Sequence, residues 1–157
     1  MTRINAVAHL RPRVRGMKLF VPLDGSACSL RALRHAVELA KRVGDCAIHI
    51  AHAHEEPLLY GEVAVYVPRE TIERLQREDS EGVLARAEPL LKSAGVPYEK
   101  EVLLGPVAQV LAERAASLGC DAIVMGTNGL TALGQMIMGS IASKVVHLSA
   151  MPVTLVK

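Results

Sequence analysis

The sequence has few aromatic residues and few cysteines. Tryptophan is absent and Phe, Trp and Tyr together make up only 3% of the 157 residues, although 50% of them are hydrophobic. The core must therefore be built from Val, Ile, Leu, Ala and Met, which favours helices packed closely on a sheet over an aromatic surface that stacks nucleic-acid bases. Cys28, Cys46 and Cys120 are odd in number and widely spaced, which favours free thiols in a reducing compartment, so we expect a cytoplasmic protein.

The chain also lacks long apolar runs and any acidic residue at its start. No stretch approaches the roughly 18 consecutive apolar residues of a transmembrane helix, and the N-terminus has no secretory pattern, so we expect no membrane association. Four arginines, Arg3, Arg11, Arg13 and Arg15, fall in the first sixteen residues, whereas the rest of the chain is slightly acidic. We therefore expect a basic arm over residues 1–16, one domain over residues 17–157, and no nucleic-acid partner.

Strand and helix patterns alternate along the chain from residue 17 onward. A helix should follow the turn at Asp24 to Ser26 and end at Gly44, and a long helix from residue 70 should be kinked or divided by Pro89. Two more helices should follow Pro106 and begin at Ser140, whereas residues 54–69 carry no readable motif. Predicted strands cover residues 19–21, 47–53, 98–104, 122–125 and 153–156.

This alternation predicts an α/β fold, an open parallel sheet with right-handed crossovers and helices on both faces. The strand over residues 98–104 begins with Glu99, Lys100 and Glu101, so it should lie at a sheet edge. Ligands of such sheets bind beyond the carboxyl ends of the strands, where the strand order reverses. The loops after the first and fourth strands are therefore the expected site.

The loop after the fourth strand is rich in glycine. Gly126 and Gly129 are followed after nine residues by Gly139, and Ser140 then opens a helix. Glycines let backbone amides approach a ligand closely, and a helix N-terminus offers free amides and a partial positive charge to phosphate oxygens. Tight turns also need glycine for backbone reasons, so the pattern alone indicates a nucleotide only weakly.

The spacing of this loop, G-x-x-G-x9-G-S, resembles the nucleotide-binding signature of the universal stress protein family. The likeness extends to KLFVPLDGS in the first strand and turn, ALRHAVELAKRVG in the helix that follows, IAHAH in the second strand and SAMPVTLVK at the end. The resemblance implies a five-stranded, Rossmann-like sheet of order 3-2-1-4-5 that binds ATP across the ends of strands one and four. It also implies a homodimer formed through the last strand, Val153 to Val156.

The resemblance assigns site residues position by position. Pro22, Leu23 and Asp24 would line the adenosine, with Asp24 accepting a hydrogen bond from ribose or base, and Ala53 would lie beside the adenine. Met125 and Gly126 would lie under the ribose. The phosphates would be surrounded by six residues: Asn128, Gly129, Gly139, Ser140, Ile141 and Ala142.

Asn128 departs from the family pattern, which often has His or Arg at this position. A neutral amide binds phosphate without charge, which weakens the binding of a triphosphate and leaves the preference among ATP, ADP and AMP open. Mg²⁺ would be bound mainly through the phosphates. No catalytic base is found near the proposed phosphates, so we expect a nucleotide-dependent regulatory or stress-response module with slow or no hydrolysis.

Other functions remain open in the sequence. The alternatives are a dimeric interaction module of the same fold that binds no nucleotide, and a weak ATPase. His52 and His54 share one strand face, but no Cys or carboxylate set accompanies them, so we predict no metal site. Cys28 at a helix start could be redox-active, although packing under the loop is the favoured interpretation. P-loop and dinucleotide-binding motifs are absent.

Overall fold

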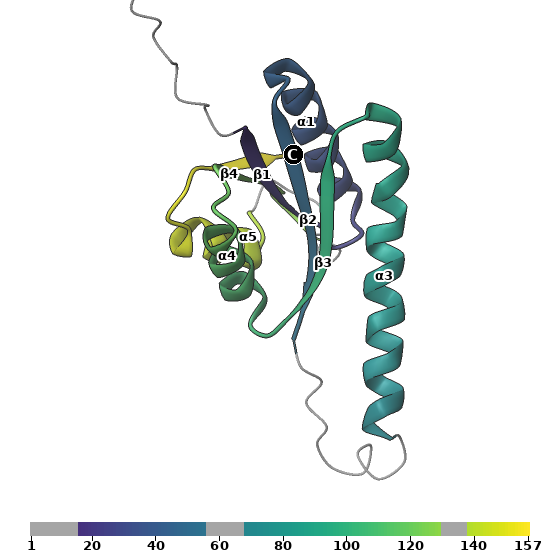
Figure 1. The fold of residues 1–157 in the computed structure, drawn as a ribbon. Helices are drawn as coiled ribbons and strands as arrows, with labels where there is room; N and C mark the ends of the chain where they lie inside the picture. The colour runs from purple at the N-terminus through teal and green to yellow at the C-terminus, as the bar shows by residue number, and fades with distance from the viewer. Residues whose placement is uncertain (1–15, 56–67, 130–137) are drawn as a thin grey trace, which may run out of the picture.

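The computed structural model describes residues 16–55, 68–129 and 138–157. Within them, a five-stranded parallel sheet has the order β3-β2-β1-β4-β5 and carries helices on both faces (Figure 1), which confirms the predicted fold class and strand order. The strands are β1 (Met17–Pro22), β2 (Cys46–His54), β3 (Tyr98–Leu104), β4 (Ala122–Gly126) and β5 (Val153–Val156). The helices are α1 (Ala27–Val43), α3 (Arg69–Ala94), α4 (Val107–Ser117) and α5 (Ser140–Leu148). The predictions made for residues 1–15 and 56–67 lie outside the described part of the chain.

The turn between β1 and α1 frees an acidic side chain at the end of β1. Ser26 caps α1, because its hydroxyl accepts a hydrogen bond from the Ser29 amide at 3.0 Å. Asp24 does not cap the helix and accepts a hydrogen bond from the Ser26 amide through Oδ1 at 2.9 Å. Asp24 therefore stands one turn before the helix, at the carboxyl end of the sheet.

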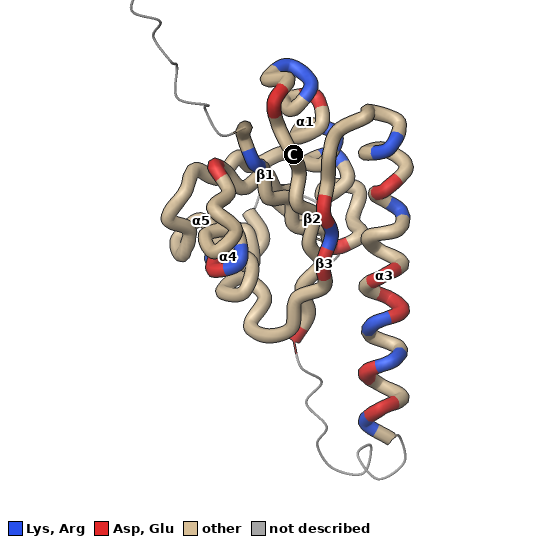
Figure 2. Tube along the Cα trace, viewed as in Figure 1, with Lys and Arg blue, Asp and Glu red and all other residues tan. Residues whose placement is uncertain are grey.

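Helix α3 continues without a break through Pro89. Of the two outcomes expected at Pro89, a kink or a division, the division does not occur, since a proline removes only one backbone hydrogen bond and Ala87 and Leu91 on either side of it are fully buried. Charges of both signs alternate along this helix (Figure 2), with i,i+4 ion pairs that include Arg69–Glu73 and Arg74–Glu78. The long exposed helix is thus stabilised by its own charge pattern as well as by packing.

The sheet separates two apolar layers. Leu19, Val21 and Ile48 point into the layer covered by α1 and α3, and Phe20 and Ile123 point into the layer covered by α4 and α5. Strand β3 lies at one edge, as its mixed polar sequence predicted, and β5 lies at the other. None of the helices in the described part of the chain is both long and apolar enough to span a membrane.

Candidate functional site

A cavity of about 300 Å³ opens at the carboxyl ends of β1 and β4. The structure gathers around it all twelve residues that the sequence assigned to the site, drawn from segments that are more than a hundred residues apart. The lining comprises Pro22, Leu23, Asp24, Ser29, Ala53, Val107, Leu111, Met125, Gly126, Thr127, Asn128, Gly129, Gly139, Ser140, Ile141 and Ala142. Four of these, Ser29, Val107, Leu111 and Thr127, were not predicted from the sequence.

One wall of the cavity is apolar. Val107 and Leu111 come from the start of α4, one helical turn apart, and face Leu23, Ala53 and Met125 from the sheet. The sequence predicts a helix after Pro106, but only the tertiary fold brings Val107 and Leu111 of this helix, which contacts β2 and β3, to the cavity. Such a wall suits a flat apolar group such as a purine base.

Asp24 supplies the one carboxylate in the cavity lining. Oδ1 is engaged by the Ser26 amide at 2.9 Å, whereas Oδ2 lies 2.6 Å from the point where a Cβ of residue 129 would stand. Oδ2 accepts no hydrogen bond from the described residues. Because an ionised carboxylate only accepts hydrogen bonds, Asp24 is suited to bind a donor such as a hydroxyl or amino group of a ligand.

Glycine is required where the loop after β4 approaches other backbone. A Cβ at Gly126 would lie 2.9 Å from Cys28 Sγ and 3.0 Å from the Cys28 carbonyl carbon, so the end of β4 could not contact α1 with any larger residue. A Cβ at Gly139 would lie 3.3 Å from the Thr127 carbonyl oxygen, which accepts a hydrogen bond from the Gly139 amide at 2.8 Å. The glycines thus bring the two ends of the loop together.

The first turn of α5 faces the cavity without a cap. Residue Gly139 precedes the helix, no side chain caps it, and Ser140, Ile141 and Ala142 all line the cavity. The amides of a first helical turn have no partner inside the helix, so they are available to a ligand and favour a negative charge. Asn128 Oδ1 is a further buried polar atom in the lining, with no hydrogen-bond partner in the structure.

The rings of His52 and His54 contact backbone carbonyl oxygens close to them. The Nδ1 atom of His52 donates a hydrogen bond to the Leu23 carbonyl oxygen at 2.7 Å, and Nδ1 of His54 lies 3.2 Å from the Glu55 carbonyl oxygen. His52 thereby ties β2 to the segment that carries Asp24. The residues described by the structure contain no group of three or more His, Cys, Asp or Glu placed to hold a metal ion.

Cys28 lies directly beneath the glycine loop. Its Sγ donates to the Val156 carbonyl oxygen at 3.2 Å and lies 3.9 Å from Thr127 Oγ1. Burial raises the pKa of this thiol, but hydrogen bonds from the backbone of Asn128 and from Thr127 outweigh burial and hold it below its usual value. The side chain is buried, in agreement with the packing role favoured by the sequence.

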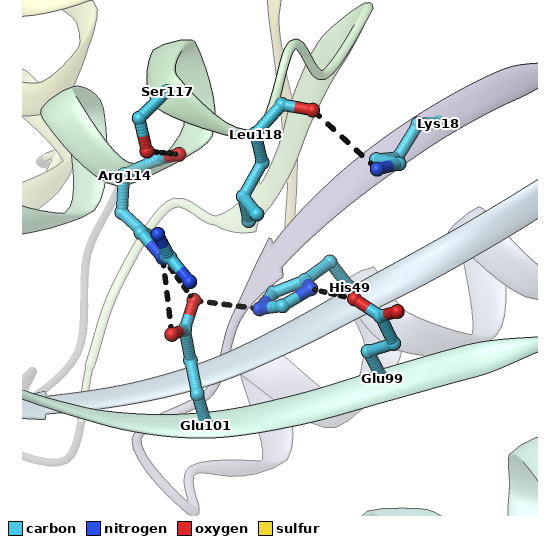
Figure 3. A network of polar contacts seen from close by, with 7 residues as sticks. All are labelled: Lys18, His49, Glu99, Glu101, Arg114, Ser117 and Leu118. Carbon is cyan, nitrogen blue, oxygen red and sulfur yellow. Dashed lines mark hydrogen bonds and ion pairs between the residues drawn. The ribbon is translucent and has the colours of Figure 1, made fainter.

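A second polar cluster lies away from the cavity, between the sheet and α4 (Figure 3). The ring of His49 is buried, stacks on Phe20 and has Glu101 Oε1 2.6 Å from Nε2 and Glu99 Oε2 3.3 Å from Nδ1. Both contacts are hydrogen bonds only when both ring nitrogens carry a proton. Arg114 Nε donates to both oxygens of Glu101, at 2.8 and 3.0 Å, so the cluster joins β2, edge strand β3 and α4.

Two carboxylates, Glu101 in this cluster and Glu88 in α3, predict loss of stability in acid. Burial raises the pKa of Glu101, but hydrogen bonds from Arg114 and His49 outweigh burial and leave this pKa below its usual 4.5. Hydrogen bonds from Lys100, Lys92 and Tyr98 lower the pKa of Glu88 to about 2. A carboxylate whose pKa is lowered by folding stabilises the fold at pH values above its pKa in the unfolded chain. That contribution is lost as the pH falls through its pKa in the folded protein. We expect stability to fall between pH 4.5 and about 2.

The variant Glu101→Gln isolates one part of this loss. At pH 7 it should be less stable than the parent by about 1–3 kcal/mol, since hydrogen bonds to a charged group are lost, and the difference should shrink as pH falls below 4.5. Urea denaturation across this range measures it. Glu113→Gln on the exposed side of α4, where Glu113 accepts only from Gln109, is the matched control. A difference that does not shrink as the pH falls contradicts the electrostatic origin.

Comparison with known proteins places the chain in a family. The family model described as "Universal stress protein family" matches residues 17–157. The chain is 33% identical over 146 residues to universal stress protein YxiE of Bacillus subtilis, covering 89% of this chain and 98% of the relative. It is 31% identical over 140 residues to universal stress protein MJ0531 of Methanocaldococcus jannaschii, covering 89% and 81%. This chain belongs to the universal stress protein family.

Solved structures share the fold of this universal stress protein. The hypothetical protein MJ0577 matches with a TM-score of 0.77 and 22% identity, over 92% of this chain and 97% of the other. The universal stress protein of Archaeoglobus fulgidus in complex with dAMP matches with a TM-score of 0.65 and 22% identity, over 91% and 99%. The family protein At3g01520 of Arabidopsis thaliana with AMP bound matches with a TM-score of 0.65 and 19% identity, over 90% and 91%. Adenine nucleotides are therefore ligands of proteins with this fold.

Proposed function

We propose that this universal stress protein binds adenine nucleotides, ATP among them, in the cavity between β1 and β4. The observation that carries the proposal is the arrangement of the lining: an apolar wall from Val107 and Leu111, an acceptor at Asp24 Oδ2, and the uncapped first turn of α5. These fit a purine base, a ribose and a phosphate in turn. Asn128 Oδ1, buried without a partner, would be satisfied by a donor from the ligand.

The test has two steps. Nucleotide released from the purified, denatured protein is identified by chromatography, and the stripped and refolded protein, or protein purified free of nucleotide, is titrated with AMP, ADP and ATP by calorimetry. At least one adenine nucleotide should bind one site per chain. If none binds to folded protein, the alternative of an interaction module without a nucleotide site is the better account.

The same lining supports a regulatory role rather than rapid catalysis. Among the described residues of the lining only Asp24 is ionisable, and the proposed ribose occupies it, so none of these residues offers a general base to a water molecule at the phosphates. We expect ATP turnover well below about 1 per second, the low end of typical enzymes. Phosphate release from protein free of contaminating ATPases measures it, with Mg²⁺ present and bound mainly through the phosphates. Faster turnover would contradict the regulatory role.

We also propose that the chain is a homodimer joined through β5. This strand lies at the sheet edge, where no strand of the described residues pairs with its outer side, and Val146 and Leu148 in the preceding helix α5 are exposed. Light scattering at micromolar concentration should give twice the chain mass of 16.8 kDa. A mass of one chain would contradict the pairing.

The three cysteines form no disulfide, which supports the proposed cytoplasmic location.

A further inference from the structure

The segment that joins β4 to the first turn of α5 contains no charged residue. From Met125 to Ser143 the sequence contains no Lys, Arg, His, Asp or Glu. Asp24 is the one ionisable residue in the cavity lining, and its carboxylate lies against Gly129 at the start of that segment. The described side chains of the lining therefore carry a net negative charge, which disfavours a bound phosphate.

The basic residues of the described chain near this edge of the sheet are placed elsewhere. Arg31 is engaged by the Lys157 carbonyl oxygen, to which its Nε donates at 2.8 Å. The guanidinium of Arg86 packs on Gly25, which does not line the cavity. Lys144 is exposed one turn into α5 and is also absent from the lining. Residues 56–67 and 130–137 contain no Lys, Arg or His.

What remains to hold a phosphate is neutral. The first-turn amides of α5 and the side chains of Asn128 and Ser140 donate hydrogen bonds, and the helix adds a partial positive charge of about half a unit. That charge acts over the first turn only. It offsets part of the charge of one phosphate, whereas the two further phosphates of ATP add negative charge near Asp24, with no basic side chain among the described residues of the lining.

From these observations we infer that the site selects adenine nucleotides with one phosphate over ATP, because neutral donors rather than basic side chains hold the phosphate. The inference rests on the proposed adenine-nucleotide site. Its consequence is a difference in metal dependence. Mg²⁺ neutralises part of the charge of ATP and should restore ATP binding, whereas AMP needs no metal.

Calorimetric titration of the full chain with AMP and with ATP, in EDTA and then in Mg²⁺, tests the inference. In EDTA, AMP should bind at least about tenfold more tightly than ATP, a difference that corresponds to 1.4 kcal/mol. Mg²⁺ should recover about tenfold for ATP and leave AMP within about twofold. ATP binding as tightly as AMP in EDTA would overturn the inference while leaving the proposed function intact. Binding of neither nucleotide would overturn both.

A charge introduced into the loop provides a second measurement. Asn128→Lys should tighten ATP relative to AMP by about tenfold in EDTA, because it supplies the missing cation. Ser93→Lys at the exposed far end of α3 adds the same net charge away from the cavity and should leave the ratio unchanged. An unchanged ratio in folded Asn128→Lys, or an equal shift in both variants, would contradict selection by the loop.

Discussion

Gly139→Val is expected to weaken nucleotide binding by roughly 100-fold while the protein remains folded. A Cβ at this position already lies 3.3 Å from the Thr127 carbonyl oxygen, tighter than an ordinary contact, and the two valine methyl groups require still more room. The Gly139 amide would be pushed from Thr127, to which it donates at 2.8 Å, and the first turn of α5 would move with it. Loss of two charge-assisted hydrogen bonds to phosphate costs about 3 kcal/mol, or roughly 100-fold in affinity.

Calorimetry with AMP measures this loss, and circular dichroism establishes whether the variant is folded. Gly82→Val is the matched control, because a Cβ at Gly82 in α3 meets no atom within 4 Å. The control should bind AMP as the parent does. Unchanged affinity in a folded Gly139→Val protein would remove the glycine loop from the site.

The second large effect is expected from Asp24→Ala. The carboxylate offers Oδ2 to the cavity, and a hydrogen bond between a ligand hydroxyl and a charged group contributes about 1.5–3 kcal/mol, so affinity should fall about 10- to 100-fold. AMP and ATP should both lose affinity, because they share the ribose, but ATP should lose less, because Asp24→Ala also removes the carboxylate that lies near its phosphates.

Asp24→Asn is the informative companion variant. Its amide oxygen can still accept from the Ser26 amide, so the turn before α1 is kept while the negative charge is removed. We expect a smaller loss for AMP and a relative gain for ATP, whose phosphates no longer meet a carboxylate. A loss in Asp24→Asn equal to that in Asp24→Ala for every nucleotide would mean that the charge, and not the position of the acceptor, holds the ribose.

The arrangement of the sheet could be predicted because its signals are local. Gly44 and Gly95 end helices, Pro106 precedes one, and the apolar positions recur with helical or strand period between them. The charged start of β3 identified an edge strand for the same reason. Strand order came from the resemblance to a family, since nothing in a single strand records its neighbours.

The missed features of the site depend on tertiary contacts. Val107 and Leu111 have the helical spacing of core residues, and only the position of α4 in the fold makes them part of the cavity wall. Pro89 predicted a kink or a break because sequence rules weigh the lost hydrogen bond and not the burial of Ala87 and Leu91 on either side, and the helix is not divided there. The cluster of His49, Glu101 and Arg114 gave no signal, because its members come from three separate elements.

The carbonyl oxygen of Val156 accepts from the Thr127 amide at 2.9 Å and from Cys28 Sγ at 3.2 Å. The last residue of the edge strand, the start of the glycine loop and the first turn of α1 therefore meet at one oxygen atom. A ligand that orders the backbone from Thr127 to Gly129 also restricts the end of β5, where a second copy of the chain would pair. Binding and dimerisation would then be linked, and linkage is reciprocal. If the dimer binds nucleotide more tightly than the single chain does, bound nucleotide strengthens dimerisation by the same free energy.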